Sequence, residues 1–547
     1  MGSFLALAGR CFYLQFCKGG HYVDACRRQQ AYTSRQPQRG AILDGRGRVL
    51  AASNKIQIIK AEPRIIDDPR EVSNRLAPIV NMAADEICKL IEDRRDSGYV
   101  RIKVGVDPCE CSLAGKVHRG IAVESDWRRH YPMGPLAANI VGFTDPYGVG
   151  LEGIELKYDE ELTGSAARNV FFADVLRRPI RPKEQEGVLT NGVGIILTID
   201  ATIQQFVRDE LIKRYQEYEA ESAVAIVAEP KTGAILAMVS LPDFDPANRN
   251  CDPNNFRSRA LTDWHEPGSV LKPFTVAIAL DAGAIKENET IFCENGSYSG
   301  EGFGRIGEYR RGFGNLTIAE ILIESSNIGM AKIGQKLGKE KLYEGLTLFG
   351  FGKRTGIELP GEVEGLLRKP DAWNGYSVTR IPFGQEICVT GIQLIRAFCI
   401  LANGGRLVRP FMVRAIVDHN GQIKDLKRPP PPVGYIIKPE VAEWLLTKVL
   451  TRVVNEGTGK RAKLDKWQVF GKTGTANIAL SNSRGYSKSN YMASFMAGAP
   501  AEDPAIVVLV SIRKPNKALG KGYEGGVVAS PVGAKIIERT LTYLGVE

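Results

Sequence analysis

The order of strand and helix patterns after residue 196 constrains the fold of this chain more than any other feature. Two runs of small and β-branched residues, 223–228 and 234–240, are joined by Pro230-Lys231-Thr232-Gly233, whose proline and glycine favour a hairpin turn. Three more strand patterns come near the C-terminus, at 467–470, 491–497 and 505–510. Helical patterns lie between and after these strands, at 270–283, 318–337, 391–402, 438–453 and 531–543. This order predicts one antiparallel sheet beside a helical cluster, an α+β fold.

The first part of the chain differs from this pattern. It mixes short strand-like runs, such as 56–59, with helical stretches, such as 83–92, separated by many glycine and proline turns. At 196–200 a strand pattern is followed by a long helical pattern with apolar residues on one face. We therefore expect three parts: an N-terminal segment at 1–29, an α+β module at 30–195 and a larger domain at 196–547.

The N-terminal segment is apolar over residues 4–16, but Gly9 and Arg10 interrupt it. A helix needs about 20 apolar residues to cross a bilayer, so this stretch cannot span one as written. Two interpretations remain open. The stretch is an amphipathic helix buried against the protein, or it is the end of a membrane-anchor helix whose first half lies upstream of Met1.

Composition narrows the classes of partner and cofactor. The net charge is +10, but the 62 acidic residues are interspersed with the 72 basic ones, and there is no nucleic-acid motif, so we expect no nucleic-acid partner. Most of the ten cysteines, such as Cys388 and Cys399, stand singly in apolar runs, which is typical of small core residues. Cys109 and Cys111 have no second pair at zinc-site spacing, so we expect neither a metal nor another cofactor.

The pattern S-x-x-K offers a serine nucleophile with a base in reach, and it occurs at Ser269-Val270-Leu271-Lys272 and at Ser511-Ile512-Arg513-Lys514. Residues three apart share a face on a helix but take opposite faces on a strand. Ser511 follows a β-branched run, so its hydroxyl should point away from Lys514. Ser269 opens a helical pattern, so we expect it at the helix N-cap with Lys272 one turn along, beside its hydroxyl.

A lysine can act as a base only when it is uncharged part of the time, and burial or a nearby cation lowers its pKa from about 10.4. A second cation and a polar side chain should therefore lie near Lys272. Ser325-Ser326-Asn327 separates a helix begun by the capping pair Thr317 and Glu320 from a second helical run. Such a polar turn can present Ser325 and Asn327 to a cleft.

The second cation is Lys472, in Lys472-Thr473-Gly474-Thr475 directly after the strand pattern 467–470. A strand edge there would offer threonine hydroxyls, a lysine charge and backbone N–H groups to an extended peptide, and Gly474 would let a substrate backbone approach. The other copy, Lys231-Thr232-Gly233, is explained by the hairpin turn. Each motif, taken singly, also has a structural explanation. S-x-x-K fits a capping serine with a solvated lysine, S-x-N fits a helix junction, and K-T-G fits a surface turn.

Taken in order, S-x-x-K, S-x-N and K-T-G resemble the signature of penicillin-binding proteins and serine β-lactamases. Over nearly its whole length the chain resembles class B penicillin-binding proteins, the monofunctional, division-type peptidoglycan DD-transpeptidases. The stretches that carry this resemblance are 39–44, 150–155, 197–200, 265–269, 470–476 and 525–531.

The resemblance implies a transpeptidase domain preceded by an elongated pedestal or dimerisation module and a membrane anchor, incomplete here. It implies that Ser269 is the acylated nucleophile and Lys272 its base, with Ser325 and Asn327 moving a proton and holding substrate amide. It also implies that the K-T-G strand grips the carboxylate side of the substrate, and that two backbone N–H groups form the oxyanion hole. The residues implied to hold the carboxylate side are Lys472, Thr473, Gly474 and Thr475. The N–H groups implied to form the oxyanion hole are those of Ser269 and Thr475.

The implied reaction is cross-linking of stem peptides that end in D-Ala-D-Ala, with release of D-Ala, transfer to an acceptor amine and inhibition by β-lactams. The implied setting is a bacterial membrane, with one anchor helix and the catalytic domain outside the cytoplasm, beside a glycan-polymerising glycosyltransferase and division proteins. Two alternatives stay open: a carboxypeptidase or β-lactamase that passes the acyl group to water, and a non-catalytic β-lactam receptor or scaffold. The long module before the catalytic domain favours a wall synthase.

Overall fold

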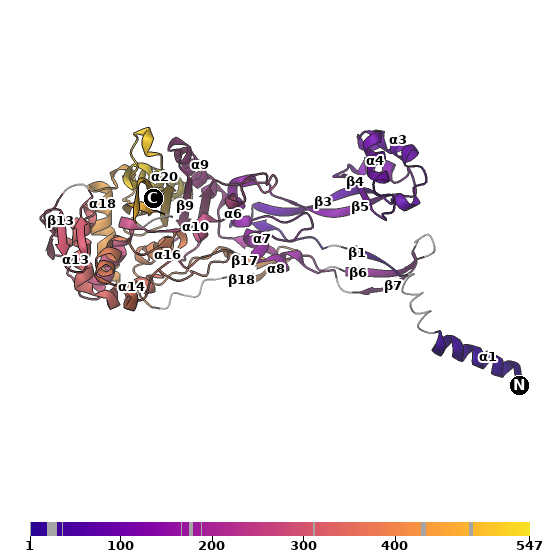
Figure 1. Ribbon diagram of the computed structural model, residues 1–547, viewed down its shortest axis with the longest axis horizontal. Coiled ribbons are helices and arrows are strands. Elements are labelled where there is room, and N and C mark those ends of the chain that lie inside the picture. Colours follow the sequence, from indigo (N-terminus) through magenta and orange to yellow (C-terminus); the bar gives the residue numbers. More distant parts are fainter. Residues whose placement is uncertain are drawn as a thin grey trace.

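The computed structural model describes residues 2–18, 30–35, 37–165, 167–173, 179–186, 189–309, 312–427, 434–480 and 485–547. The molecule is elongated, with a broad unit at one end and a narrower arm at the other (Figure 1). The C-terminus lies in the broad unit, and helices α3 (Pro69–Val80) and α4 (Ala84–Glu92) lie at the tip of the arm.

The broad unit is built on a five-stranded antiparallel sheet of order β10-β9-β21-β20-β19. As the sequence predicts, a hairpin from early in the domain joins three strands from its end. Among the described residues, strand β19 pairs with β20 alone, so its other edge is unpaired. The strands are β9 (Ser222–Ala228), β10 (Ile235–Leu241), β19 (Phe470–Ala479), β20 (Tyr486–Ala499) and β21 (Ile506–Arg513).

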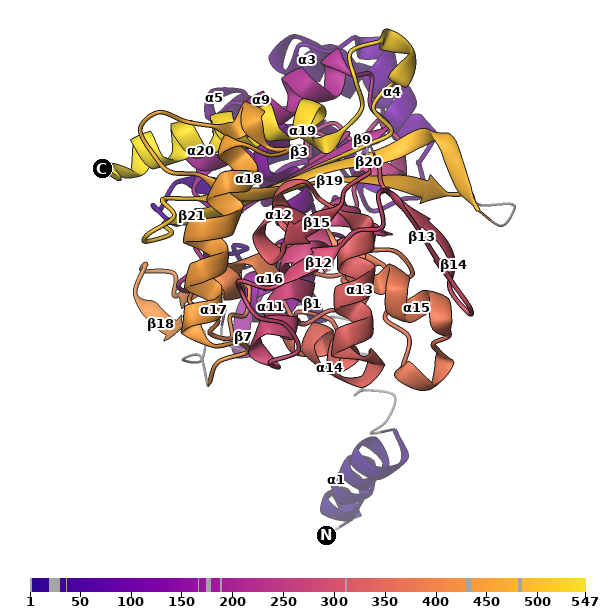
Figure 2. The same ribbon diagram turned by 90° about the vertical axis from the view of Figure 1, so that its left-hand side faces the viewer.

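Helices cover both faces of this sheet (Figure 2). On one face α9 (Ala201–Glu217) and α20 (Ser530–Leu544) pack over an apolar core that includes Val508, Val510 and Ile537. On the other face lies the predicted helical cluster, around α16 (Gly391–Ala402), in which all but one of the side chains are buried. Its other helices are α11 (Lys272–Asp281), α12 (Ile318–Ile323), α13 (Asn327–Leu337), α14 (Lys339–Phe349), α17 (Pro439–Trp444) and α18 (Thr451–Asn455).

The structure corrects three of the expected element bounds. The helical pattern at 318–337 is two helices, α12 and α13, broken by a turn at 324–326. The pattern at 438–453 contains a π-helical turn, η8 (Leu445–Leu450), between α17 and α18. The strand expected at 467–470 begins only at Phe470, because the chain bends at 465–467, and it continues through the K-T-G motif.

Short elements connect the helices around the cluster. Among them the hairpin β13 (Ser297–Gly300) and β14 (Gly304–Gly307) precedes the second motif, and the 3-10 turn η5 (Gly268–Leu271) carries the first. The others are α10 (Arg259–Thr262), β11 (Trp264–His265), β12 (Thr290–Phe292), β15 (Asn315–Thr317), α15 (Gly375–Arg380), β16 (Val389–Thr390) and α19 (Gly525–Val528).

The arm is an α+β module around a seven-stranded sheet, with β5 paired to β3. Two of its strands, β17 (Val413–Val417) and β18 (Ile423–Leu426), come from late in the chain, so sequence-distant segments share one sheet. The boundary at 195–196 stays a prediction. The remaining strands of this sheet are β2 (Ile42–Leu43), β3 (Val49–Ala61), β4 (Val100–Val104), β5 (Ile121–His130) and β8 (Gly194–Leu197).

Several smaller elements complete the arm. A second sheet has the order β1-β6-β7, and helix α5 packs with α3 and α4 over a small core of their own. The bounds are β1 (Gln30–Arg35), β6 (Ala167–Ala173), β7 (Pro179–Glu186), α5 (Pro108–Ala114), α6 (Ala138–Val141), α7 (Gly153–Lys157) and α8 (Asp159–Thr163).

Buried ion pairs join the stretches that carry the family resemblance. Arg39 donates to Glu155 Oε2 at 2.7 Å, and Arg129 donates to Glu155 Oε1 at 2.6 Å. All three side chains are buried, so the two guanidinium groups neutralise a carboxylate that has no access to water. Next to them, Arg48 bridges Asp44 and Asp200, which links the start of the arm to the N-cap of α9.

The N-terminal segment forms helix α1 (Gly2–Phe12), continued by a π-helical turn to Cys17. The apolar side chains that the structure describes in α1 are exposed; Phe4, for example, is 81% exposed. The interpretation as a helix buried against this chain is therefore wrong. Within the residues that the structure describes, every helix is too short or too polar to cross a bilayer. Residues 19–29 of the expected segment lie outside the described ranges.

Candidate active site

The S-x-x-K motif lies at the start of α11, in the turn η5 and the first helical residue. Gly268 has φ +56°, a left-handed backbone that favours glycine, and its N–H donates to Gly384 O at 3.0 Å. Ser269 lies inside this 3-10 turn and makes no capping hydrogen bond, so the expected N-cap position is wrong. The tight turn instead continues directly into α11, with Pro273 in its first turn as expected.

Lys272 is completely buried, and its amine faces the second motif. Its Nζ donates to Ser325 O at 2.6 Å, to Asn327 Oδ1 at 2.8 Å and to Ser325 Oγ at 3.2 Å. Among the described residues these are its hydrogen bonds; the Ser269 hydroxyl is not bonded to it. Burial lowers the pKa of Lys272 to about 7, although the Glu308 carboxylate acts in the opposite direction. The amine is thus available as a base near neutral pH.

Ser325 occupies the turn between α12 and α13 in a left-handed conformation, with φ +63°. This region disfavours residues other than glycine, so packing and hydrogen bonds on both sides must hold it there. The conformation places Ser325 Oγ between two amines, 3.2 Å from Lys272 Nζ and 3.0 Å from Lys472 Nζ. Ser326 is the N-cap of α13 and accepts a hydrogen bond from Gly329 N.

Lys472 lies on the edge strand β19 and is also completely buried. Burial, and then the charge of Lys272, hold the pKa of Lys472 well below its usual value. Two amines that share one hydroxyl cannot both stay protonated without repulsion, so their titrations are coupled. The second lysine that the sequence predicts near Lys272 is therefore present.

The rest of the K-T-G motif lies along the same strand. Thr473 and Thr475 face the cleft, with Thr473 Oγ1 2.6 Å from Thr458 Oγ1 and Thr475 Oγ1 accepting from Gly525 N at 3.1 Å. A Cβ atom on Gly474 would lie 2.9 Å from Val270 Cγ1. Gly474 therefore permits β19 to pack against the turn η5. The need for glycine here comes from packing within the protein, in addition to the expected approach of a substrate backbone.

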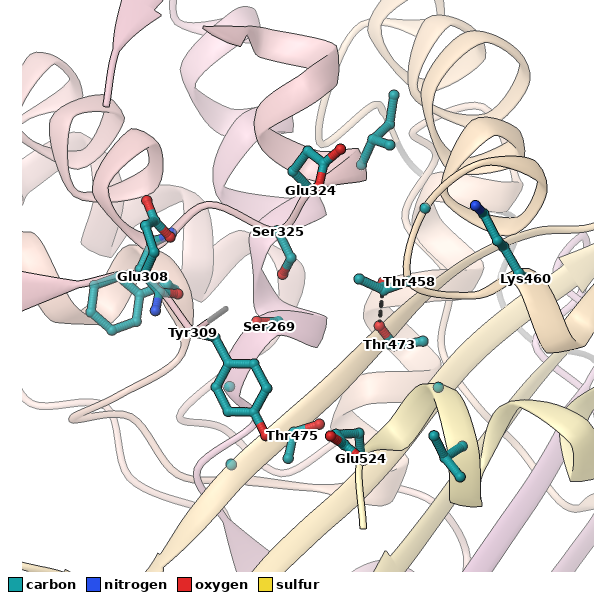
Figure 3. A pocket seen from close by; sticks show the side chains of 18 of the residues that line it. Ser269, Glu308, Tyr309, Glu324, Ser325, Thr458, Lys460, Thr473, Thr475 and Glu524 are labelled. Atoms are coloured by element: carbon teal, nitrogen blue, oxygen red, sulfur yellow. Dashed lines mark hydrogen bonds between the residues drawn. The ribbon is translucent and has the colours of Figure 1, made fainter. Parts of the chain in front are cut away.

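These residues surround one cleft of about 650 Å³. Figure 3 shows Ser269 and Ser325 in the middle of it, with Thr458 and Thr473 to one side and Glu308 and Tyr309 to the other. The two lysines lie beneath this surface, bonded to Ser325. Every residue singled out from the three motifs thus belongs to one site: Ser269, Lys272, Ser325, Asn327, Lys472, Thr473, Gly474 and Thr475.

Sequence reasoning missed several residues that line the cleft. Thr458 and Glu308 each contact a motif residue, and Tyr309 donates from its hydroxyl to that of Tyr523 at 3.0 Å. Thr458 lies in Gly457-Thr458-Gly459, a glycine-rich turn that could have drawn attention. Glu308 and Tyr309 have no such signal, because their contacts depend on how the hairpin β13–β14 packs.

Known proteins resemble the chain over both of its main parts. Residues 223–538 match the family described as penicillin binding protein transpeptidase domain. Residues 34–193 match the penicillin-binding protein dimerisation domain.

Whole proteins match as well. Stage V sporulation protein D of Bacillus subtilis is 31% identical, over 100% of this chain and 84% of that protein. The probable peptidoglycan D,D-transpeptidase PenA of Neisseria gonorrhoeae is 31% identical, over 99% of this chain and 91% of PenA. Peptidoglycan D,D-transpeptidase FtsI of Escherichia coli is 28% identical, over 99% of this chain and 90% of FtsI.

Solved structures share the fold. A peptidoglycan synthetase from Bifidobacterium adolescentis superposes with a TM-score of 0.76 at 26% identity, covering 94% of this chain and 97% of that one. Penicillin-binding protein 3 from Mycobacterium tuberculosis, solved with aztreonam, has the same fold with a TM-score of 0.72 at 24% identity, covering 94% and 98%. With the three motifs in one cleft and both domains matched, the chain belongs to the class B penicillin-binding proteins and is a serine-type peptidoglycan D,D-transpeptidase.

Proposed function

We propose that Ser269 is the residue acylated during peptidoglycan cross-linking and that Lys272 is its base. The observation that carries this proposal is the Ser325 hydroxyl held between two buried amines beside Ser269. Such an arrangement supplies an uncharged amine, a second hydroxyl that can pass a proton, and a nucleophile open to the cleft.

In the acylation step, Lys272 takes the proton of the Ser269 hydroxyl as Oγ bonds to the carbonyl carbon of the penultimate D-alanine. The backbone N–H groups of Ser269 and Thr475 receive the developing oxyanion. When the C–N bond breaks, the leaving nitrogen takes a proton passed from Lys272 through the Ser325 hydroxyl, and D-Ala departs. The Ser269 to Lys272 hydrogen bond forms as substrate binds, since such contacts are often loose in a free enzyme.

In the transfer step, the acceptor amine attacks the ester carbon and gives one proton to Lys272. The C–O bond breaks, and Ser269 Oγ recovers that proton. Water in place of the amine would give the carboxypeptidase reaction, and a β-lactam would stop at the acyl ester. The unpaired edge of β19 supports an extended donor peptide, with Thr473 and Thr475 gripping its carboxylate and Lys472 supporting them from beneath through its hydrogen bond to Ser325.

The protein acts on peptidoglycan and binds β-lactams as a member of its family. Its membrane attachment and protein partners are proposals. The exposed apolar side chains of this N-terminal segment, such as Phe4 in α1 and Phe16 in the π-helical turn after it, support attachment to a bacterial membrane with the catalytic domain outside the cytoplasm. The module at 30–195 would then hold the cleft away from the membrane and contact a glycan-polymerising glycosyltransferase and division proteins.

A transfer assay tests this function. The protein is incubated with a peptide ending in D-Ala-D-Ala and with a D-amino acid as acceptor, and exchange of the last residue is compared with hydrolysis. We expect exchange to exceed hydrolysis and Ser269→Ala to abolish both. Hydrolysis that dominates at every acceptor concentration would favour the carboxypeptidase alternative, and binding of β-lactam without either reaction would favour the receptor alternative.

A further inference from the structure

The second motif is held from outside by a residue that belongs to none of the three motifs. Glu308 directly follows β14 and lines the cleft, on the side of Ser325 away from Thr473 (Figure 3). It lies 17 residues before Ser325, on a segment separated from that turn by β15 and α12.

Both carboxylate oxygens of Glu308 accept hydrogen bonds from the start of α13. Oε1 accepts from Ser326 Oγ at 2.6 Å and from Ile328 N at 3.1 Å, and Oε2 accepts from Asn327 N at 2.8 Å. The first N–H groups of a helix have no partner within the helix, and a negative charge there is favoured by the helix dipole. Glu308 therefore fixes the turn that carries Ser325 through three bonds at once.

The residue before Glu308 orients the side chain of Asn327. Asn327 Nδ2 donates to Gly307 O at 3.2 Å, so the amide oxygen is the atom left to face Lys272, 2.8 Å from its Nζ. Gly307 thus holds the side chain of Asn327, and Glu308 holds its backbone N–H. A reversed amide would point two donors at the lysine, which has no acceptor when protonated.

Glu308 also places a negative charge near a buried amine. The groups that face Lys272 are Ser325 and Asn327 from the turn, the Lys472 amine from β19 and this carboxylate behind the turn. Burial favours the uncharged form of Lys272, whereas Glu308 favours its ammonium form. The carboxylate therefore limits how far the pKa of Lys272 falls.

We propose that Glu308 is a positioning residue that holds the Ser325–Asn327 turn in its catalytic geometry and sets the charge balance around the two lysines. The inference rests on the proposed roles of Lys272, Ser325 and Asn327. It adds to them a residue from another element, whose removal changes both how fast Ser269 is acylated and at which pH.

The test compares Glu308→Gln with Glu308→Asp, and uses Glu538→Gln as the matched control. Glu538 lies on α20 outside the cleft and accepts a hydrogen bond from Lys535 Nζ at 2.7 Å on the surface. The second-order rate of acylation by a fluorescent penicillin is measured from pH 5.5 to 9, together with the melting temperature. Glutamine offers one acceptor oxygen instead of two and turns its NH₂ toward backbone N–H groups.

We expect Glu308→Gln to lower the acylation rate at the high-pH plateau about 10- to 100-fold, the effect of losing hydrogen bonds to a charged group. The acid limb of the pH–rate profile, where the rate rises with pH, should move to lower pH, because Lys272 loses the carboxylate that favours its protonated form. Glu308→Asp keeps the charge, so its acid limb should stay close to that of the parent protein while its plateau falls. The control should match the parent in both.

Two results would overturn the inference. The first is a Glu308→Gln protein with the plateau and the acid limb of the parent. The second is a slower Glu308→Gln protein whose acid limb stays in place, which would reduce Glu308 to a structural residue. If Glu308→Gln does not fold, a Glu308→Asp protein with a displaced acid limb would count against the proposal. Labelling that survives Ser269→Ala would instead refute the proposed function, whatever Glu308 does.

Discussion

At the scale of single residues, the site depends on two buried amines around one hydroxyl. Neither Lys272 nor Lys472 reaches solvent, and Ser325 Oγ is within 3.2 Å of both amines. Burying a lysine favours its uncharged form, which is the form that can take a proton from a serine. The distances therefore explain why a lysine, normally a poor base at neutral pH, can serve here.

The first prediction concerns pH. Because the pKa of Lys272 lies at about 7 and only its uncharged form accepts the Ser269 proton, acylation should rise as pH increases through about 7. Lys272→Arg should lower the rate by about 100-fold or more at every pH, since arginine stays protonated. Stopped-flow labelling with a penicillin from pH 5.5 to 9 measures both. Lys514→Ala, in the second S-x-x-K match, is the control. A rate independent of pH over this range would contradict the assignment of the base.

The second prediction separates the backbone of Ser325 from its hydroxyl. Both Ser325→Gly and Ser325→Ala remove the proton path, so both should lose acyl transfer. The left-handed φ of +63° favours glycine over alanine by about 1 kcal/mol, so Ser325→Gly should be the more stable of the two. Chemical denaturation gives the stabilities. Equal stabilities would mean that the turn relaxes once the hydroxyl is gone.

Sequence patterns predict which residues form the site, but not which contacts these residues make. Lys272 was expected beside the Ser269 hydroxyl, but its hydrogen bonds go to Ser325 and Asn327. Spacing along a helix says which residues share a face, whereas the rotamer depends on the acceptors that another helix brings. Glu308 could not be found for the same reason, because its three bonds cross from a separate hairpin.

At the scale of elements, the edge strand β19 carries the third motif inside its pairing with β20. Lys472 pairs with Met496 and Thr475 with Ala493, so the motif lies on a strand edge, as the sequence predicts, and not in the surface turn that was the alternative. The bounds of the strand were less well predicted, because apolar alternation is weak in the polar sequence K-T-G-T.

The helices α11 and α16 lie close to the expected ranges 270–283 and 391–402, because their apolar repeats run over several turns. The short helices α12, α17 and α18 were merged with their neighbours, and α14 was not predicted.

The third prediction tests the contact between this strand and the turn η5. Gly474→Ala would place a methyl group 2.9 Å from Val270 Cγ1 and 3.2 Å from Pro267 O, so strand and turn must separate. We expect a loss of stability of about 1–3 kcal/mol and a larger proportional loss of acylation. Gly314→Ala, whose nearest neighbour would be 3.8 Å away, is the control. Unchanged acylation in Gly474→Ala would mean that the close packing does not position Ser269.

At the scale of the whole molecule, the arm and the catalytic unit are joined by a shared sheet and by buried ion pairs. Ile195 of β8 pairs with Ile42 of β2 and with Ile416 of β17. The sequence predicts an α+β module before the catalytic domain but not this exchange of strands. Pairing between segments more than 200 residues apart depends on tertiary packing, for which local patterns carry no signal.

The fourth prediction concerns the ion pairs of the arm. Glu155→Ala would leave Arg129 buried without its carboxylate and Arg39 with Asp159 alone, and removing one partner of a buried pair destabilises by about 3–5 kcal/mol. We expect earlier unfolding and faster proteolysis of the arm, with penicillin acylation preserved, because Glu155 does not line the cleft. A variant that loses acylation while its arm stays protease-resistant would contradict this separation of roles.

The most direct test of the account is to locate the acylated residue by mass spectrometry after treatment with benzylpenicillin. The account predicts a single penicilloyl adduct, carried by the peptide that contains Ser269 and absent from the Ser269→Ala protein. An adduct on Ser325, Ser511 or any other residue of the intact protein, or none at all, would contradict it.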